Sequence, residues 1–570
     1  LQTAGYTTAA IGKWGLQGKG GKAPNWTAHP LNRGFDYYLG YIRHGDGHEH
    51  YPKEGIYRGK KEVYENRVNI ADDLDKCYTT DLFTAAAKKW IVDFKKSEDA
   101  DKPFFMYLAY DTPHAVLELP TQAYPAGGGL NGGLQWLGEP GKMINTASGD
   151  VDSWMHPDYA NATYDDDGNP ATAQLAWPEV YKRYATDTRR IDDAVGDILQ
   201  LLKDLKIDEN TMVVFTSDNG PSKESYLANE PIDPTFFKSY GPFDGIKRDC
   251  LEGGVRMPTL ALWPGNIPAG NHIETPSISY DWMPTFAQMA GLPAPAISDG
   301  VSLLPSLLGK GTQAESNIYI EYFQPGKTPD YADFIPEHQG RARNQMQMVR
   351  IENYVGLRYD IKSHNDPFEI YDVLKDPQQT QNLAKDPKLA SLQQKMKDKV
   401  LGSRIPNSTA LRPYDDVPVP SIPEGEMKSG IQWKAFKGDF PWVPEVATLY
   451  QFETGKVDQL NGVINVGNGS GAMFFEGYIR VPSDGDYTFY VSANSGALLR
   501  IHDAAVIDAD YEYFQNSPNS GSIKLKAGLH PFRVYYKSPK KGKPSLELEW
   551  SGPGQERKTI PTSVFFQPKK

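Results

Sequence analysis

The spacing of hydrophobic residues changes its period once along the 570-residue chain, and this change limits the folds that the chain can adopt. Before residue 404, apolar runs alternate with segments that have helical spacing. After residue 429, short segments alternate between apolar and polar residues and are separated by turns. Residues 404–429 are rich in proline and polar side chains and are predicted to form a linker. The sequence therefore predicts three parts, namely 1–403, 404–429 and 430–570.

The first part shows predicted helices that are followed by predicted strands. A helix that begins near Asp81 leads to the apolar run 103–110, and a helix over about 178–205 leads to the run 211–217. Both runs are continuously apolar, as expected for strands covered on both faces. Another strand is expected over residues 6–13. This alternation predicts a layered α/β fold.

Two further groups of short strands follow along the chain. The first group predicts a small antiparallel sheet and consists of 317–322, 346–351, 354–359 and 368–373. The second group predicts an all-β sandwich after the linker and consists of 475–481, 486–492, 497–502, 530–536 and 545–550.

Composition excludes several classes of function. The net charge of −12 argues against a nucleic-acid binder held by a general basic surface. No apolar run reaches the roughly 18 residues that a membrane-spanning helix needs. The two cysteines, Cys77 and Cys250, are too few for a disulfide framework. We therefore expect a globular protein whose partners are neither nucleic acids nor a membrane bilayer.

Polar residues directly follow the two apolar runs, where ligand-binding residues of open α/β sheets collect. Asp111 to His114 follow the first run, and Asp218 and Asn219 follow the second. A carboxylate beside an amide offers hard oxygen ligands for Ca²⁺ or Mg²⁺, although Asp-Asn-Gly is also typical of a simple turn. Lys13 also falls at a strand end, but a single lysine is most often a surface charge.

Two other segments carry candidate residues. Lys247 lies in the glycine-rich segment 243–258, and His44, His48 and His50 lie close together near the start of the chain. The histidines fit a solvated loop, and a zinc site there would lack cysteine partners. Taken singly, these signals do not choose between a surface and a functional site.

The order of the motifs is more specific than any one of them, and over about residues 1–400 the chain resembles the formylglycine-dependent sulfatases of the alkaline-phosphatase superfamily. The matching motifs are IGKWGL (11–16), RGFDYYLGY (33–41), DTPHA (111–115), TSDNGP (216–221), GIKRDCLEGGVRMP (245–258), YDWMPTFAQMAGL (280–292) and FEIYDVLKDPQQTQNLAKDP (368–387). The resemblance implies an alkaline-phosphatase-like layered fold with a mixed central sheet. It also implies a sulfuric ester hydrolase that cleaves sulfate from a sulfated carbohydrate or an aryl sulfate.

The resemblance assigns roles that suit this chemistry. Lys13 and Lys247 would be the paired lysines that clamp the sulfate oxygens as compact positive charges. His114 would donate to the sulfate or assist the leaving oxygen. Asp218 and Asn219 would supply part of a Ca²⁺ site, with Mg²⁺ as the other candidate metal.

This chain departs from the common family pattern at one catalytic position. Where many members have a histidine after Lys-Trp, it has Gly15. We expect His48 or His50 to fill that place, because members with this Gly-Lys-Trp-Gly form carry a histidine-rich loop slightly downstream.

The family's nucleophile is a hydrated formylglycine made from Cys or Ser in a Cys/Ser-x-Pro/Ala-x-Arg segment. Neither Cys77 nor Cys250 stands in such a segment, no serine does, and the family's first pair of aspartate ligands is also absent. The chain opens at Leu1 inside what reads as a helix-to-strand unit. We therefore expect the formylglycine in a preceding segment and expect this chain alone to be inactive.

The region of about 430–566 resembles the protective-antigen-type β-sandwich. The matching stretches are 474–510, 527–538 and 546–554. Such modules are attached to carbohydrate enzymes and adhesins, so both carbohydrate contact and a purely structural role remain open. A periplasmic or secreted location is implied by the family resemblance alone.

Two alternative functions remain open at this point. The first is a phosphatase or phosphodiesterase of the same superfamily, whose two-metal members commonly carry a histidine close behind the strand-end aspartate. Here Asp218-Asn219 is followed by GPSKES, and paired lysines replace the second metal, which favours sulfate. The second is a non-catalytic, sulfatase-like binding protein, which the lack of a nucleophile motif would fit.

Overall fold

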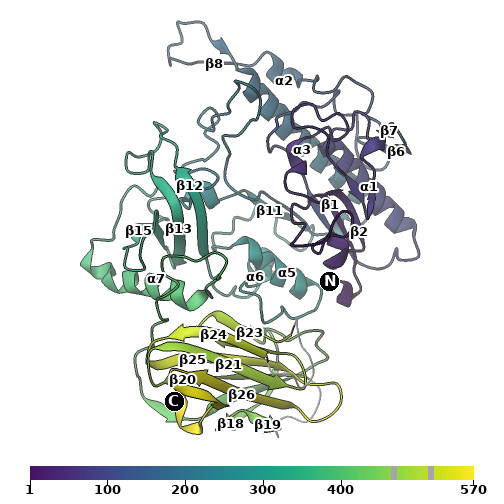
Figure 1. Ribbon diagram of the computed structural model, residues 1–570. Coiled ribbons are helices and arrows are strands. Elements are labelled where there is room, and N and C mark those ends of the chain that lie inside the picture. The colour runs from purple at the N-terminus through teal and green to yellow at the C-terminus, as the bar shows by residue number, and fades with distance from the viewer. Residues whose placement is uncertain (464–470, 511–518, 570) are drawn as a thin grey trace. The chain divides into compact units, whose positions relative to one another are not determined.

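The computed structural model describes residues 1–463, 471–510 and 519–569, and the chain divides into two compact units. The first unit comprises Leu1–Ser239 and Pro258–Gly270, and the second comprises Tyr240–Met257 and Asn271–Lys570. Figure 1 shows the helices and strands of both units.

The first unit contains a five-stranded sheet with the order β4-β3-β2-β1-β5. Its strands are β1 (Thr7–Lys13), β2 (Tyr37–Tyr41), β3 (Tyr64–Glu65), β4 (Val68–Asn69) and β5 (Phe104–Ala109). β1 lies between β2 and β5 and is parallel to both, while β3 pairs antiparallel with β2 and with β4, so the predicted mixed sheet is confirmed. At Gly12 (φ +105°) a Cβ atom would lie 2.0 Å from the Ala109 carbonyl oxygen, which is why β1 carries glycine just before Lys13.

Two long helices pack against each other in this unit, and α1 also contacts β1 and β2 (Figure 1). They are α1 (Thr79–Lys96) and α3 (Glu179–Asp204). The Arg190 guanidinium of α3 donates to both carboxylate oxygens of Asp81 in α1, at 2.7 and 2.6 Å. The helix that was predicted to begin near Asp81 begins at Thr79, two residues earlier. The Asp81 side chain is buried and joins the two helices.

The prediction that both apolar runs are covered on both faces is wrong. Tyr107 of β5 keeps 47% of its surface exposed and Phe215 keeps 37%. β10 (Val213–Thr216) pairs only with β11 (Thr259–Leu262) among the described strands, and β5 lies at an edge of its sheet. An apolar run shows which residue types a strand contains, but it does not show how much of the strand neighbouring elements cover.

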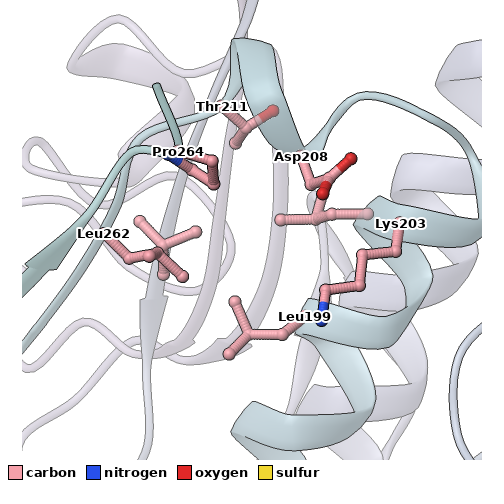
Figure 2. Close-up of a pocket in the computed structure, with 8 residues that line it drawn as sticks. Leu199, Lys203, Asp208, Thr211, Leu262 and Pro264 are labelled. Carbon is pink, nitrogen blue, oxygen red and sulfur yellow. The ribbon is translucent and has the colours of Figure 1, made fainter. Parts of the chain in front are cut away.

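A small cavity of about 60 Å³ lies between the C-terminal part of α3 and the β10–β11 pair (Figure 2). Leu199, Lys203, Asp208, Thr211, Leu262 and Pro264 are among its lining residues. The cavity contains none of the residues predicted to carry chemistry, so it is a packing gap and not a candidate active site.

The remaining elements of the first unit are short. They are β6 (Trp136–Glu139), β7 (Lys142–Ile144), α2 (Pro157–Ala160), β8 (Thr163–Tyr164) and β9 (Leu175–Ala176). They lie in the long segment between β5 and α3.

The second unit contains the predicted small antiparallel sheet, in the order β12-β13-β14-β15. Its strands are β12 (Tyr319–Lys327), β13 (Ala342–Ile351), β14 (Tyr354–Arg358) and β15 (Glu369–Asp372). The helices of this unit are α4 (Glu252–Val255), α5 (Trp282–Met289), α6 (Leu304–Leu308) and α7 (Ala390–Ser403), of which α7 packs on β13.

The second unit also contains the predicted all-β sandwich, which has two antiparallel sheets. The larger sheet has β16 (Met427–Ser429), β17 (Ile431–Lys437), β18 (Gln451–Val457), β20 (Gly471–Val481), β22 (Ala497–Ile501), β23 (Ala504–Asp508), β25 (Gly528–Lys537) and β28 (Phe565–Pro568). The smaller has β19 (Asn461–Val463), β21 (Gly485–Ala493), β24 (Asn519–Leu525), β26 (Ser545–Gly552) and β27 (Gln555–Thr559). Side chains from both sheets form one core that includes Phe475, Phe489 and Trp550.

The sandwich is joined closely to the segment before it. The buried Arg500 guanidinium donates to the carbonyl oxygens of Ala296, Ile297 and Ser298 and to Asp299. Within residues 404–429, Val419 and Ile422 bridge to β24 and to the start of β25, and the last three residues form β16. In the described part of the chain, none of the helices is long and apolar enough to cross a bilayer.

Replacing Arg190 with Met should destabilise the first unit by about 3–5 kcal/mol, because it leaves the buried Asp81 carboxylate without its cation. Urea unfolding, with amide hydrogen exchange in α1 and α3 as the readout, would measure this loss of stability. As a control, Lys89→Met removes an exposed pair with Asp93 and should cost less than about 0.5 kcal/mol. Equal effects of the two substitutions would contradict the prediction.

Candidate active site

Lys13 lies at the carboxyl end of β1, under the loop that carries the three histidines. Its Nζ donates to the Gly47 carbonyl oxygen at 3.5 Å, and a Cβ at Gly47 would lie 2.6 Å from the Lys13 side chain. This part of the loop is held by an ion pair in which Arg43 donates to both oxygens of Asp46. The close approach of Gly47 therefore places the lysine beside the histidine that follows it.

His48 stacks on His114, with ring centroids 4.7 Å apart and an angle of 2° between the planes. His44 meets the edge of His48 at 5.0 Å. Burial and the positive charge of Lys13 lower the pKa of His48 to about 3, so its imidazole is neutral at physiological pH. Its buried Nε2 has no hydrogen-bond partner within the described residues. An orphaned imidazole nitrogen beside a lysine is available to a ligand.

His114 lies in the loop that follows β5, and its ring is oriented by the backbone. Its Nδ1 donates to the Ala115 carbonyl oxygen at 2.8 Å, so in the neutral form of the ring Nε2 would be the acceptor nitrogen. The same loop is anchored on the first turn of α1, where Thr79 donates to Asp111 and the hydroxyls of Thr80 and Thr112 lie 2.6 Å apart.

His50 is fully buried, so it differs from His48 in what it can contact. Its Nε2 donates to the His114 carbonyl oxygen and its Nδ1 to Asp111, each at 3.0 Å. Although burial alone would lower it, Asp111 and neighbouring carboxyl groups raise the pKa of His50 to about 10. His50 is thus an imidazolium that fixes the loop carrying His114, and a direct catalytic role for it stays a prediction.

Buried carboxyl groups surround His50. Burial raises the pKa of Glu118 to about 9 and that of Asp187 to about 8. Glu118 accepts from the His50 backbone N–H, and Asp187 accepts from the Tyr78 hydroxyl at 3.0 Å. The cluster therefore retains protons that the unfolded chain would release.

Asp218 and Asn219 lie just beyond the carboxyl end of β10, where Asp218 is exposed. The Nδ2 of Asn219 donates to Gly220, so its Oδ1 remains as an oxygen donor. After the larger effect of burial, the charge of Asp218 raises the pKa of Tyr107, whose ring contacts Trp14 next to Lys13. The oxygen donors suit Ca²⁺, but two residues supply fewer than the six to eight ligands that it takes.

Among the described residues, one group of three or more carboxylate, histidine or cysteine side chains could hold a metal ion. It consists of the exposed Asp165, Asp166 and Asp167. Asp218 and Asn219 are outside it, so their role as metal ligands stays a prediction.

Lys247 belongs to the second unit, in a segment that buried acids hold in place. Asp249 pairs with Arg343 at 2.8 Å, and Asp244 accepts from His338 at 2.8 Å. These contacts fix the segment around Lys247, whose role in binding sulfate stays a prediction.

Neither cysteine is a candidate nucleophile. Both are buried, which raises the pKa of Cys250 to about 12 and that of Cys77 above its ordinary range. Thiols in such surroundings are not ionised at neutral pH.

Sequence reasoning missed several residues around the histidines. Glu49 is fully buried and accepts from the backbone N–H groups of Ile56, Tyr57 and Arg58. The Tyr226 ring lies 5.7 Å from His48. The alternation in His48-Glu49-His50 was a signal for Glu49, whereas nothing local distinguishes Tyr226.

Comparison with known proteins identifies the family of the chain. The family profile described as Sulfatase matches residues 1–292, just over half of the chain. The chain belongs to the sulfatase family. A profile for the C-terminal part of N-sulphoglucosamine sulphohydrolase matches 239–405, and the PA14 domain profile matches 427–563. Both predicted resemblances are therefore confirmed.

Individual relatives agree with this family assignment. The chain is 31% identical to canine (Canis lupus familiaris) N-acetylgalactosamine-6-sulfatase over 316 residues, which cover 54% of this chain and 48% of the relative. It is 36% identical to steryl-sulfatase of Homo sapiens over 141 residues, 24% of each chain. Thus this sulfatase-family chain spans about half the length of the first of these curated relatives.

Among solved structures, one titled "Crystal structure of Ps i-CgsB" shares 22% identity with a TM-score of 0.47. The match covers 69% of this chain and 70% of that chain.

The stability of the first unit should fall as the pH rises from about 6.5 to 10. The protonated His50 contributes its full stabilisation below about pH 6.5, and this contribution is lost as the pH approaches 10. In the folded protein, Glu118 and Asp187 also keep their protons to about pH 9 and 8. Each retained proton gives a slope of about 1.4 kcal/mol per pH unit. Thermal unfolding across this range would measure it.

Glu118→Gln should flatten that pH dependence by about one proton, since the amide oxygen can still accept from the His50 backbone. The matched control Glu98→Gln changes an exposed side chain and should leave the slope unaltered. A wild-type stability that is constant or rises over this range would show that the cluster does not retain protons.

Proposed function

We propose that the protein is a sulfuric ester hydrolase that removes sulfate from a sulfated carbohydrate. The observation that carries the proposal is the grouping of Lys13, His48 and His114 at the carboxyl ends of β1 and β5. A lysine charge beside two imidazoles suits a tetrahedral anion bound to a leaving oxygen. Membership of the sulfatase family and the name of the amino-sugar relative support the choice of substrate class.

Each residue has a distinct role in this proposal. Lys13 binds a sulfate oxygen as a compact cation, and Lys247 is the second lysine of the clamp. The neutral imidazole of His48, with its orphaned Nε2, contacts the sulfate, and the acceptor Nε2 of His114 handles the proton of the leaving oxygen. Neither Cys77 nor Cys250 is suitable as the nucleophile.

Metal and modification complete the proposed chemistry. Asp218 and Asn219 would hold Ca²⁺, with Mg²⁺ as the alternative, through two of its oxygen ligands. When bound, such an ion polarises a sulfate oxygen. Formylglycine is the expected nucleophile, and a secreted or periplasmic location is part of the same proposal. The PA14 sandwich would contact carbohydrate.

Sulfate release from 4-nitrophenyl sulfate, by protein expressed from its complete coding sequence, should fall at least about 100-fold in kcat/KM on Lys13→Met. The reason is loss of a preorganised charge at the sulfate, for which losses of about 10²–10³ are typical. The exposed Lys19, in the loop after β1, provides the control, and Lys19→Met should keep wild-type activity. Faster hydrolysis of 4-nitrophenyl phosphate than of the sulfate would instead assign a phosphatase.

A further inference from the structure

A cation stands beside the two stacked histidines without a carboxylate of its own. The Arg58 guanidinium lies over the Tyr226 ring, 4.7 Å from its centroid. The same ring lies 5.7 Å from His48 and 6.3 Å from His114. One aromatic ring therefore separates Arg58 from the imidazoles that we assign to the sulfate.

Arg58 is exposed, and the structure forms no ion pair to it from any acidic residue that it describes. Its neighbour Arg43 differs, because Asp46 and Glu62 both lie within ion-pair distance of it. A surface arginine without a partner is common, so the charge alone would carry no inference. What sets Arg58 apart is how firmly its position is determined.

The buried Glu49 fixes the backbone at Arg58. Its two carboxylate oxygens accept from three successive N–H groups, of which that of Arg58 is the closest at 2.7 Å. A carboxylate that is fully buried and accepts three backbone bonds holds its loop in one conformation. Glu49 lies between His48 and His50. The short segment that carries these two histidines therefore also positions the loop of Arg58.

Tyr226 is held in a conformation that only a constrained segment keeps. Its φ of +55° lies in the left-handed region, which a bulky side chain rarely adopts. Tyr226 nevertheless keeps 36% of its surface exposed, and the guanidinium lies over its ring. Left-handed non-glycine residues cluster at sites where strain serves binding.

From this geometry we infer that Arg58, supported by Tyr226, binds a second anionic group of the substrate, next to the sulfate that is cleaved. The inference rests on the proposed function and makes it more specific. The guanidinium fork recognises a carboxylate or a sulfate bidentately, so the substrate is an acidic glycan with either a uronate or another sulfate near the scissile group. An aryl sulfate with no second charged group fills only the site of the histidines.

The test compares three probes on the protein expressed from its complete coding sequence. They are a disaccharide of a sulfated amino sugar and a hexuronate, the same disaccharide with its carboxyl group reduced to an alcohol, and the amino sugar alone with a second sulfate. Arg58→Gln should lower kcat/KM at least tenfold more for one of the acidic probes than for the reduced disaccharide. The probe that loses more identifies the anion as carboxylate or sulfate.

Matched variants separate recognition from folding. Lys60→Gln removes an exposed cation two residues away and should alter none of the three rates. Tyr226→Gly, which relieves the left-handed strain and removes the ring, should reproduce the selectivity of Arg58→Gln, whereas Tyr226→Phe should not. Calorimetric binding of the desulfated hexuronate disaccharide should weaken in Arg58→Gln if the carboxylate is the anion.

The outcomes distinguish this inference from the proposed function. If wild type releases sulfate but Arg58→Gln affects all probes equally, the anion subsite is refuted and the sulfatase proposal stands. The anion subsite is also refuted, and the sulfatase proposal stands, if wild type cleaves 4-nitrophenyl sulfate and shows no preference for the acidic probes. If wild type releases sulfate from none of these compounds, the proposed function itself fails.

Discussion

The ion pair between the imidazolium of His50 and the carboxylate of Asp111 holds the candidate site together. Both groups are buried, and each is tied to a different part of the fold. Asp111 is bound to the first turn of α1 through Thr79, and the other nitrogen of His50 holds the His114 carbonyl. A buried pair of this kind is costly to break, because either partner alone would be an uncompensated charge. The His114 loop therefore has little freedom to move away from β5.

Three consecutive residues divide the work around this pair. His48 stacks on His114, Glu49 holds the loop of Arg58, and His50 holds the loop of His114. The backbone leaves a short 3₁₀ turn at His48 and is extended at Glu49, so one short stretch can fix two loops and still present an imidazole. The precision of the site thus comes from backbone hydrogen bonds to buried side chains and not from the exposed residues themselves.

Local pattern predicted much of this arrangement. The strand ends at Lys13, His114 and Asp218 were evident because apolar runs stop there, and the sandwich was evident from its period of two. The sequence could not separate His48 from His50, because both are histidines of one loop and their burial depends on where α1 and the Glu118 segment pass. Tyr226 was equally hidden, since its contact with Arg58 joins distant segments. For the same reason the exposure of Tyr107 and Phe215 was missed.

The way in which residues 404–429 meet the sandwich has a practical consequence for excising that domain. Val419, Ile422 and the strand Met427–Ser429 pair with the sandwich itself, and β16 forms the border of its larger sheet next to β28. A cut made after Ser429 would remove these partners and leave unpaired backbone at the end of β24, at the start of β25 and along β28, where another chain could pair. A fragment that carries the sandwich alone should begin upstream of Val419, although the shift in composition alone would suggest a later start.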